Sequence, residues 1–144
     1  MKAIDINIDF DGTCVTHSFP LLGKDIGAVP VLKRLVKEGH RLILFTMRSD
    51  TTAEHEINDW IKPGDFLTQA VQWFKVNDIP LYGVQTNPTQ SKWTNSPKSY
   101  AALMIDDSAL GCPLIYNEEV SSRAYVDWVK VEKMLEDLGV LTKK

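Results

Sequence analysis

Two aspartates near the N-terminus are the residues whose spacing most clearly suggests chemistry. Asp9 and Asp11 are separated by one residue and end a segment of alternating apolar and polar residues, which predicts a strand. Gly12 follows and allows the chain to turn, so that both carboxylates can point toward one cavity. Like charges so close resist joint ionisation unless a cation lies between them. The pair therefore predicts a cation site, with an Asp-rich turn capped by its own side chains as the structural alternative.

A second acidic pair and a threonine follow other apolar runs. Asp106 and Asp107 come directly after AALMI, and Thr46 ends LILFT. Ligands of parallel sheets bind outside the carboxyl ends of the strands, so we expect Asp9, Thr46 and Asp106 to share one site. Taken alone, the acidic pair also suits a helix N-cap, and Thr46 suits an ordinary β-branched strand position.

Cationic side chains and a histidine complete the set of candidates. Arg48, next to Met47, can pair with a carboxylate or a phosphate. Lys98 is preferred over Lys92 as a phosphate-binding lysine because it enters the segment that feeds the Asp106 strand. His17 lies in a loop where it can touch a substrate, although a solvated loop histidine is the plainer interpretation.

Strands alternate with helices along the chain. We expect strands at 3–10, 41–46, 79–85 and 101–106, with a candidate fifth strand at 112–117. We expect helices at about 29–39, 51–61 (capped by Ser49 or Asp50), 66–77 and 123–139. This order predicts one three-layer α/β/α domain over residues 1–144, with a mostly parallel, Rossmann-like sheet.

Composition narrows the class of protein. The chain has 144 residues, of which 44% are hydrophobic and 24% charged, so it is not a disordered chain. Its net charge of −3 lacks the basic excess typical of nucleic-acid binders. No apolar run approaches the roughly 18–20 residues that span a bilayer, and acidic residues occupy the place of a secretory signal's apolar stretch. We therefore expect a cytoplasmic protein that does not bind membranes.

The ordered motifs resemble those of the haloacid dehalogenase-like phosphohydrolases. The match consists of D-F-D-G-T at 9–13, LILFT, Lys98 and the Asp106-Asp107 pair, within residues 4–107. The resemblance implies a Mg²⁺-dependent phosphatase in which Asp9 attacks phosphorus and forms an aspartyl-phosphate. It implies that Asp11 first protonates the leaving oxygen and then deprotonates water.

The resemblance also implies a ligand set. Mg²⁺ would be held by Asp9, the main-chain carbonyl of Asp11 and Asp106, with Asp107 assisting. Thr46 and Lys98 would stabilise the phosphoryl oxygens. The expected substrate-binding residues are Gly12, Thr13, His17, Met47 and Arg48.

The spacing between these motifs leaves no room for a large cap domain. A flap at about 13–27 remains, and it contains Phe19, Leu21 and Leu22. These apolar side chains would fold over a phosphorylated substrate, be covered by a second subunit of a homo-oligomer, or pack beneath the loop as a small cluster. The class of substrate and the oligomeric state stay open.

Three other functions compete with the phosphatase. A receiver-like signalling domain also forms an aspartyl-phosphate, but an acid/base at Asp11 would shorten the life of that phosphoryl group. A catalytically idle scaffold could bind a partner through the C-terminal helix, although packing on the core is the plainer role of that helix. Cys14 as a nucleophile would need an arginine at position 20, where the chain has Pro20.

Overall fold

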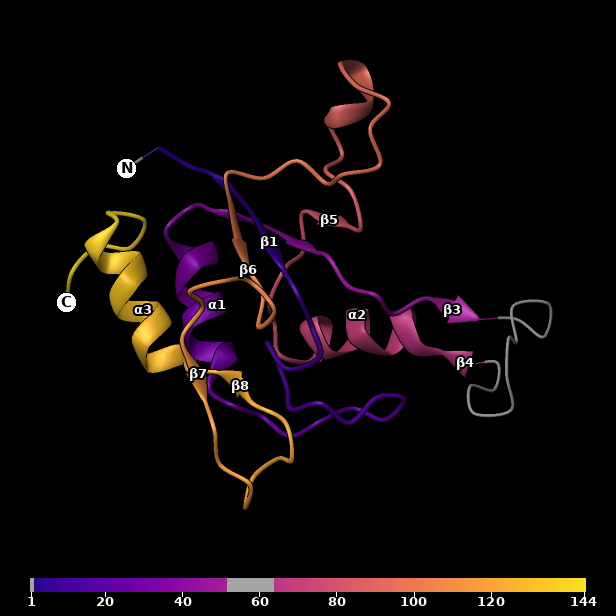
Figure 1. The fold of residues 1–144 in the computed structure, drawn as a ribbon. Helices are drawn as coiled ribbons and strands as arrows, with labels where there is room; N and C mark the ends of the chain where they lie inside the picture. The colour runs from indigo at the N-terminus through magenta and orange to yellow at the C-terminus, as the bar shows by residue number, and fades with distance from the viewer. Residues whose placement is uncertain (1, 52–63) are drawn as a thin grey trace.

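Four parallel strands form the sheet at the centre of the molecule (Figure 1). The computed structural model describes residues 2–51 and 64–144. In the order of the sheet, the strands are β5 (Gly83–Val84), β2 (Arg41–Leu44), β1 (Asp5–Ile8) and β6 (Leu103–Ile105). Because all four are parallel, their carboxyl ends lie at one edge of the sheet.

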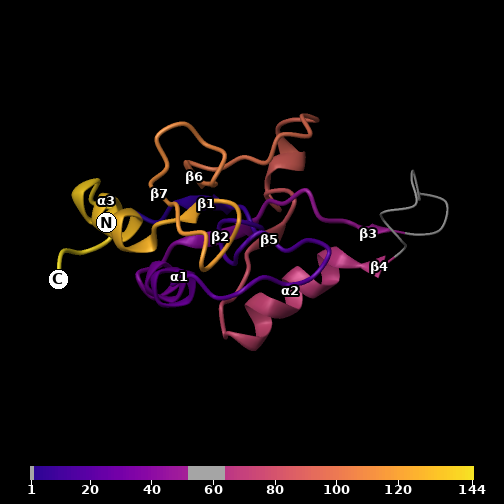
Figure 2. The ribbon, with the colours of Figure 1, turned by 60° about the horizontal axis from the view of Figure 1, so that its bottom comes forward.

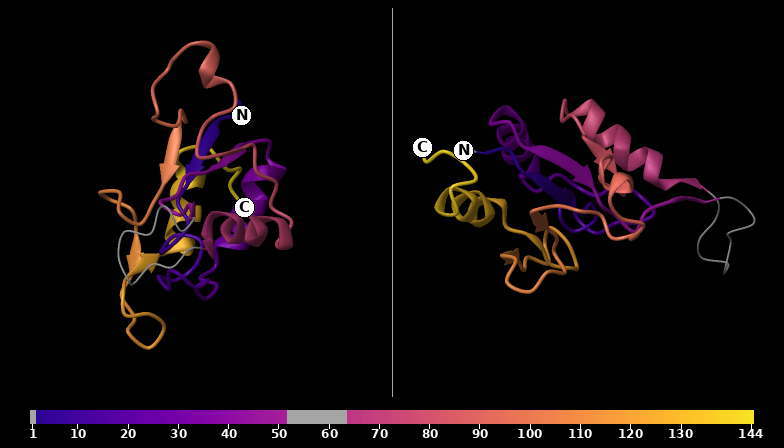
Figure 3. Two further views of the ribbon diagram at one scale, coloured as in Figure 1. Left: turned by 90° about the vertical axis from the view of Figure 1, so that its right-hand side faces the viewer. Right: turned by 90° about the horizontal axis from the view of Figure 1, so that it is seen from above.

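One face of the sheet carries the apolar core. Ile8 is in register with Leu44 and Ile105, so these side chains point to the same side. They belong to a single buried cluster with residues of three helices, which are α1 (Ala28–Lys37), α2 (Phe66–Val76) and α3 (Trp128–Asp137). Figure 3 shows α1 and α2 together on one side of the sheet.

The helices join this core because their apolar residues recur at helical spacing. The buried residues are Ala28, Val31, Leu32 and Leu35 of α1, Ala70, Trp73 and Phe74 of α2, and Trp128, Val131 and Leu135 of α3. On the outside, Arg34 of α1 bridges Glu132 and Glu136 of α3, at 3.1 and 2.8 Å. The two helices are thus joined both by apolar contacts and by a network of charges.

The other face of the sheet is covered by the loop 85–102, which contains the short 3₁₀ helix η2 (Gln90–Lys92). Asn7 of β1 donates to the Ser99 carbonyl and accepts from the Ser99 hydroxyl, at 3.1 and 3.0 Å. Asn87 donates to Asp5 at 2.7 Å. The expected single α/β domain with a parallel sheet and no large cap is therefore confirmed, and in the described residues a polar loop forms the second covering layer.

The segment 112–117 does not extend the parallel sheet. Its strand β7 (Leu114–Ile115) pairs antiparallel with β8 (Tyr125–Val126), and α3 begins only at Trp128. The side chain of Asp127 caps that helix by accepting from the Lys130 amide at 3.1 Å. The expected start of the helix at 123 is therefore wrong, because Tyr125 and Val126 form β8 before the helix begins.

The region after Arg48 also differs from expectation. Strand β3 (Asp50–Thr51) pairs antiparallel with β4 (Gly64–Asp65). The carboxylate of Asp50 accepts from the Thr68 amide and hydroxyl, at 2.9 and 2.6 Å, so it caps α2. The expected helix at 51–61 lies outside the described residues except for Thr51, which belongs to β3.

The flap 13–27 leaves the carboxyl end of β1 and reaches the beginning of α2 (Figure 2). There the ring of Phe19 meets the ring of Phe66 edge to face, with centroids 5.1 Å apart. Within the described part of the chain, no helix is long and apolar enough to cross a membrane.

Candidate active site

Three carboxylates meet where β1 and β6 end. Asp9, Asp106 and Asp107 each offer an oxygen, and these oxygens all lie within 4.8 Å of one another. The Asp9 amide donates to the Ile105 carbonyl at 3.0 Å and so ties the two strand ends together. Asp106 is further oriented by Ser108, whose amide and hydroxyl both donate to its Oδ1 at 2.8 Å. Hard oxygen donors grouped in this way fit Mg²⁺.

Crowding and burial perturb this cluster. Burial raises the pKa of Asp9 to about 8; the charges of Asp106 and Asp107 add to that rise, and the Thr13 hydroxyl, which donates to Asp9 at 2.7 Å, opposes it. Burial also acts to raise the pKa of Asp107, but hydrogen bonds from His17 and Asp9 outweigh it and hold that pKa below its usual value. A divalent cation among these oxygens would relieve the repulsion.

The turn at Gly12 requires a glycine for two reasons. Its φ of +82° lies in the left-handed region. A Cβ there would also lie 2.1 Å from Nε2 of His17 and 2.5 Å from Oδ2 of Asp107. Those two atoms are themselves 2.7 Å apart, so His17 contacts the acidic cluster from across the turn.

The C-terminal part of the chain supports the same turn. The Val126 amide of β8 donates to the Gly12 carbonyl at 3.0 Å, and the Trp128 indole donates to the Thr13 carbonyl at 2.6 Å. Asp107 also supports this turn, because its amide donates to the Thr13 hydroxyl at 3.0 Å. Both ends of the chain therefore fix the loop that carries Asp9 and Asp11.

Arg48 holds the Asp11 carboxylate with two parallel hydrogen bonds. Nε and Nη2 each donate to one oxygen at 2.8 Å. The guanidinium also donates to the Leu21 carbonyl at 2.8 Å, and it stacks on Phe10 and Phe19 at 5.1 and 5.2 Å. The Arg48 side chain is only 1% exposed. The Arg48 side chain therefore links the flap to the site, and its hydrogen bonds are made within the protein.

Thr46 lies at the site, and Gln85 holds it there. The Gln85 side chain accepts from the Thr46 amide at 2.9 Å and donates to the carbonyls of Thr46 and Arg48 at 2.7 and 3.2 Å. Gln85 directly follows β5 and has a φ of 67°, which is unusual for a residue other than glycine. Its place after the last apolar residue of an expected strand was the signal that could have identified it.

Neither Lys98 nor Lys92 is among the described residues that line the cavity at this site. Both lie on the loop 85–102 between β5 and β6 (Figure 1), and Ser99, the neighbour of Lys98, bonds to Asn7 of β1, two residues before Asp9. The assignment of Lys98 to the phosphoryl oxygens stays a prediction, without support from the lining of the cavity.

The site opens into a cavity of about 500 Å³. Its lining contains the expected residues Asp9, Asp11, His17, Thr46, Met47, Arg48, Asp106 and Asp107. Phe19 of the flap lines it as well, together with Ser108 and Arg123, which sequence reasoning missed. Arg123 follows two serines in a polar segment, and nothing in that pattern marks it as functional.

Cys14 lies beneath the site without access to the cavity. It is fully buried, and its thiol donates to the Asp9 carbonyl at 3.3 Å. Burial raises the pKa of Cys14 well above its usual value, and nearby carboxylates add to the effect. The structure thus supports the rejection of a thiolate nucleophile.

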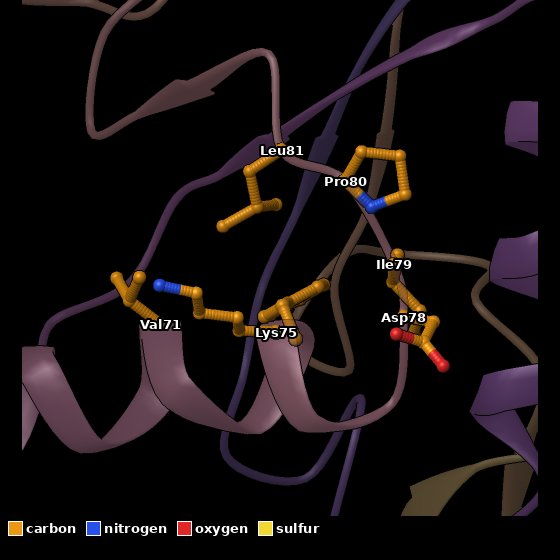
Figure 4. A pocket seen from close by; sticks show the side chains of 7 residues that line it. Val71, Lys75, Asp78, Ile79, Pro80 and Leu81 are labelled. Atoms are coloured by element: carbon orange, nitrogen blue, oxygen red, sulfur yellow. The ribbon is translucent and has the colours of Figure 1, made fainter.

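A second hollow, of about 440 Å³, lies between α2 and residues 78–81 (Figure 4). Its lining includes Val71, Ile79, Pro80 and Leu81, and Lys75 extends along it. It contains no part of the acidic cluster.

Fold and site together define an α/β protein with an acidic centre at the carboxyl ends of parallel strands. Comparison with protein-family models and with curated proteins finds no match. A solved structure of a conserved protein from Bacteroides thetaiotaomicron is similar to this chain, with 29% sequence identity and a TM-score of 0.70. The alignment covers 95% of this chain and 93% of that protein.

Proposed function

We propose that this protein is a Mg²⁺-dependent phosphatase of the haloacid dehalogenase-like type, which hydrolyses a phosphate monoester through an aspartyl-phosphate. One observation carries the proposal. Asp9 meets Asp106 and Asp107 within 4.8 Å in a cavity that also contains Asp11. A nucleophile, an acid/base and a set of metal ligands are thereby available to one substrate.

In the first step, an oxygen of Asp9 attacks phosphorus and the bond to the leaving oxygen breaks, while a proton from Asp11 goes to that oxygen. In the second step, Asp11 takes a proton from water, and the water oxygen attacks phosphorus. This releases inorganic phosphate and regenerates Asp9. Because both oxygens of Asp11 accept from Arg48, Asp11 must give up one of these bonds to reach the substrate.

Asp9, Asp106 and Asp107 would hold Mg²⁺, with the Asp11 carbonyl as a further ligand. When bound, the ion neutralises phosphoryl charge and allows an anionic nucleophile to approach an anion. The Thr46 hydroxyl accepts from the Arg48 amide at 3.1 Å, which leaves its proton available to donate to a phosphoryl oxygen. We place the reaction in the cytoplasm, since both cysteines are free and suit a reducing compartment.

The test is hydrolysis of p-nitrophenyl phosphate and a panel of phosphate monoesters, with and without Mg²⁺. Asp9→Asn should abolish turnover and the phosphoenzyme. Asp11→Asn should slow turnover by about 10²–10⁴-fold. The slowing of the first step should be smallest with p-nitrophenyl phosphate, because its leaving group needs little protonation. Asp25→Asn, which alters an exposed carboxylate of the flap, is the matched control. Mg²⁺ should also raise the melting temperature, and Asp106→Ala should remove most of that rise.

Three outcomes contradict the proposal. Full activity of Asp9→Asn would mean that the nucleophile is another group. A stable phosphoprotein formed from a small phosphodonor would favour the receiver-like function. An absence of turnover across the panel, with Mg²⁺ bound, would favour an idle binding protein.

A further inference from the structure

The proposed reaction needs a cation on the phosphoryl group besides the metal, and the expected residues do not supply one. Arg48 is buried and committed to Asp11 and the flap. Lys92 and Lys98 are not among the residues that line the cavity. Of the described residues that line the cavity, Arg123 alone combines a permanent positive charge with a side chain not bonded to another described residue.

The fold holds Arg123 beside the catalytic loop. It lies just before β8, whose Val126 amide donates to the Gly12 carbonyl at 3.0 Å. From the other side, Lys24 of the flap donates to the Val120 carbonyl at 3.3 Å. The segment 116–124, which joins β7 to β8, is thereby attached to both the flap and the turn after Asp9.

Within the cavity, Arg123 accompanies Asp106, Asp107 and Ser108. An exposed arginine near carboxylates usually pairs with one of them, yet no such pair forms here among the described residues. Its guanidinium is therefore free to bind an incoming anion. Arginine suits a phosphoryl group because its planar fork can donate to two oxygens at once.

We propose that Arg123 binds the phosphoryl group of the substrate and takes the part that Lys98 was expected to play. This inference rests on the proposed phosphatase function and adds the residue that recognises the dianionic group. It also predicts that recognition centres on the phosphoryl group itself, independent of any second anionic group in the substrate.

The test compares Arg123→Met, which keeps the length and removes the charge, with Arg123→Lys and with Lys130→Met. Lys130 lies on the exposed side of α3 and supplies the matched loss of one charge. Arg123→Met should lower kcat/KM for p-nitrophenyl phosphate and raise the inhibition constant of inorganic phosphate, each by about ten- to a hundredfold. Arg123→Lys should recover part of the loss, and Lys130→Met should change neither value.

Free guanidinium provides a readout that a merely structural role would not move. Added to Arg123→Ala, it should restore part of the activity, whereas it should not help Asp9→Asn. An unchanged inhibition constant in Arg123→Met would overturn the proposal. So would a loss confined to esters that carry a second anionic group, since Arg123 would then bind that group.

Failure of the phosphatase function itself would be distinguishable. If the wild type hydrolyses nothing, the rise in melting temperature caused by inorganic phosphate in the presence of Mg²⁺ still reports on Arg123. A rise in the wild type that is absent from Arg123→Met supports the phosphoryl contact. A rise of the same size in both, or in neither, rejects it.

Discussion

The residue type of Arg48 suggests that it binds an anionic substrate, but in the structure its guanidinium is bonded to Asp11 and to the flap. Its guanidinium lies over the rings of both Phe10 and Phe19 and binds Asp11 through two hydrogen bonds. A buried charge is tolerated only when paired and hydrogen-bonded, and here both conditions hold. Arg48 is therefore a positioning residue, which sets where Asp11 rests and ties the flap to the site.

Arg48→Met should leave the Asp11 carboxylate without its partner. Loss of one member of a buried pair costs about 3–5 kcal/mol, so a value near 3 is expected for a pair in which Asp11 keeps some exposure. Urea unfolding measures this cost. Adding Asp11→Asn should recover part of it, because the stranded charge is gone. If the two costs simply add, the pair does not stabilise the fold.

The sequence predicts the acidic residues of the site well, because strand ends can be located from apolar runs. Asp9, Thr46 and Asp106 each follow such a run, and parallel strands bring them to one edge. The partners of these residues could not be predicted in this way. Gln85 acts through tertiary contacts with Thr46 and Arg48, and only its place after an expected strand hints at them. Arg123 lies in a polar segment whose pattern marks no function. The preference for Lys98 depended on sequence proximity to Asp106.

At the scale of elements, the flap packs at the site through Phe19, whereas its two leucines are exposed. Phe19 is 43% exposed, lines the cavity and packs on Phe66 and Arg48. Leu21 and Leu22 are 71% and 44% exposed, so they do not pack beneath the loop as a buried cluster. Closure of the flap over a substrate, or its coverage by a second subunit, stays a prediction.

Phe19→Ala should change the selectivity of the enzyme more than its stability. The ring lines the cavity, so its loss should alter the ratio of kcat/KM between bulky and small phosphate esters. The rise in melting temperature caused by Mg²⁺ should persist, because the oxygens that would hold the ion belong to Asp9, Asp106 and Asp107. Leu21→Ala, at a more exposed position of the same flap, is the control. A uniform loss of activity together with a large fall in melting temperature would show that Phe19 is a core residue.

The order of elements was largely predictable from periodicity, and the pairing of short strands was not. Two-residue strands such as β7 and β8 have too few side chains for an alternating pattern to appear. The covering of the second face of the sheet by a polar loop could not be predicted either, because Asn7 and Ser99 pair across 92 positions of the chain. The sequence suggests that Asp50 caps a helix that directly follows it, whereas in the structure Asp50 accepts from Thr68 of the later helix α2.

At the scale of the whole molecule, the C-terminal region is part of the site's support. Trp128, Val131 and Leu135 are nearly fully buried in the core, which favours internal packing of α3 over the docking of a partner. The same region reaches the catalytic loop through Val126 and Trp128. Residues more than a hundred positions apart thereby fix the turn between Asp9 and Thr13.

Trp128→Phe tests this long-range support. The substitution keeps an aromatic ring in the core but removes the indole donor, which leaves the Thr13 carbonyl without its bond from Trp128. An unsatisfied buried carbonyl costs about 1–3 kcal/mol, so the midpoint of urea unfolding should fall accordingly. Because Thr13 also donates to Asp9, kcat should fall while folded protein still predominates. Trp93→Phe, at a residue that is 62% exposed, should alter neither quantity. If Trp128→Phe lowers stability but leaves kcat at the wild-type value, the C-terminal region stabilises the fold without positioning the nucleophile.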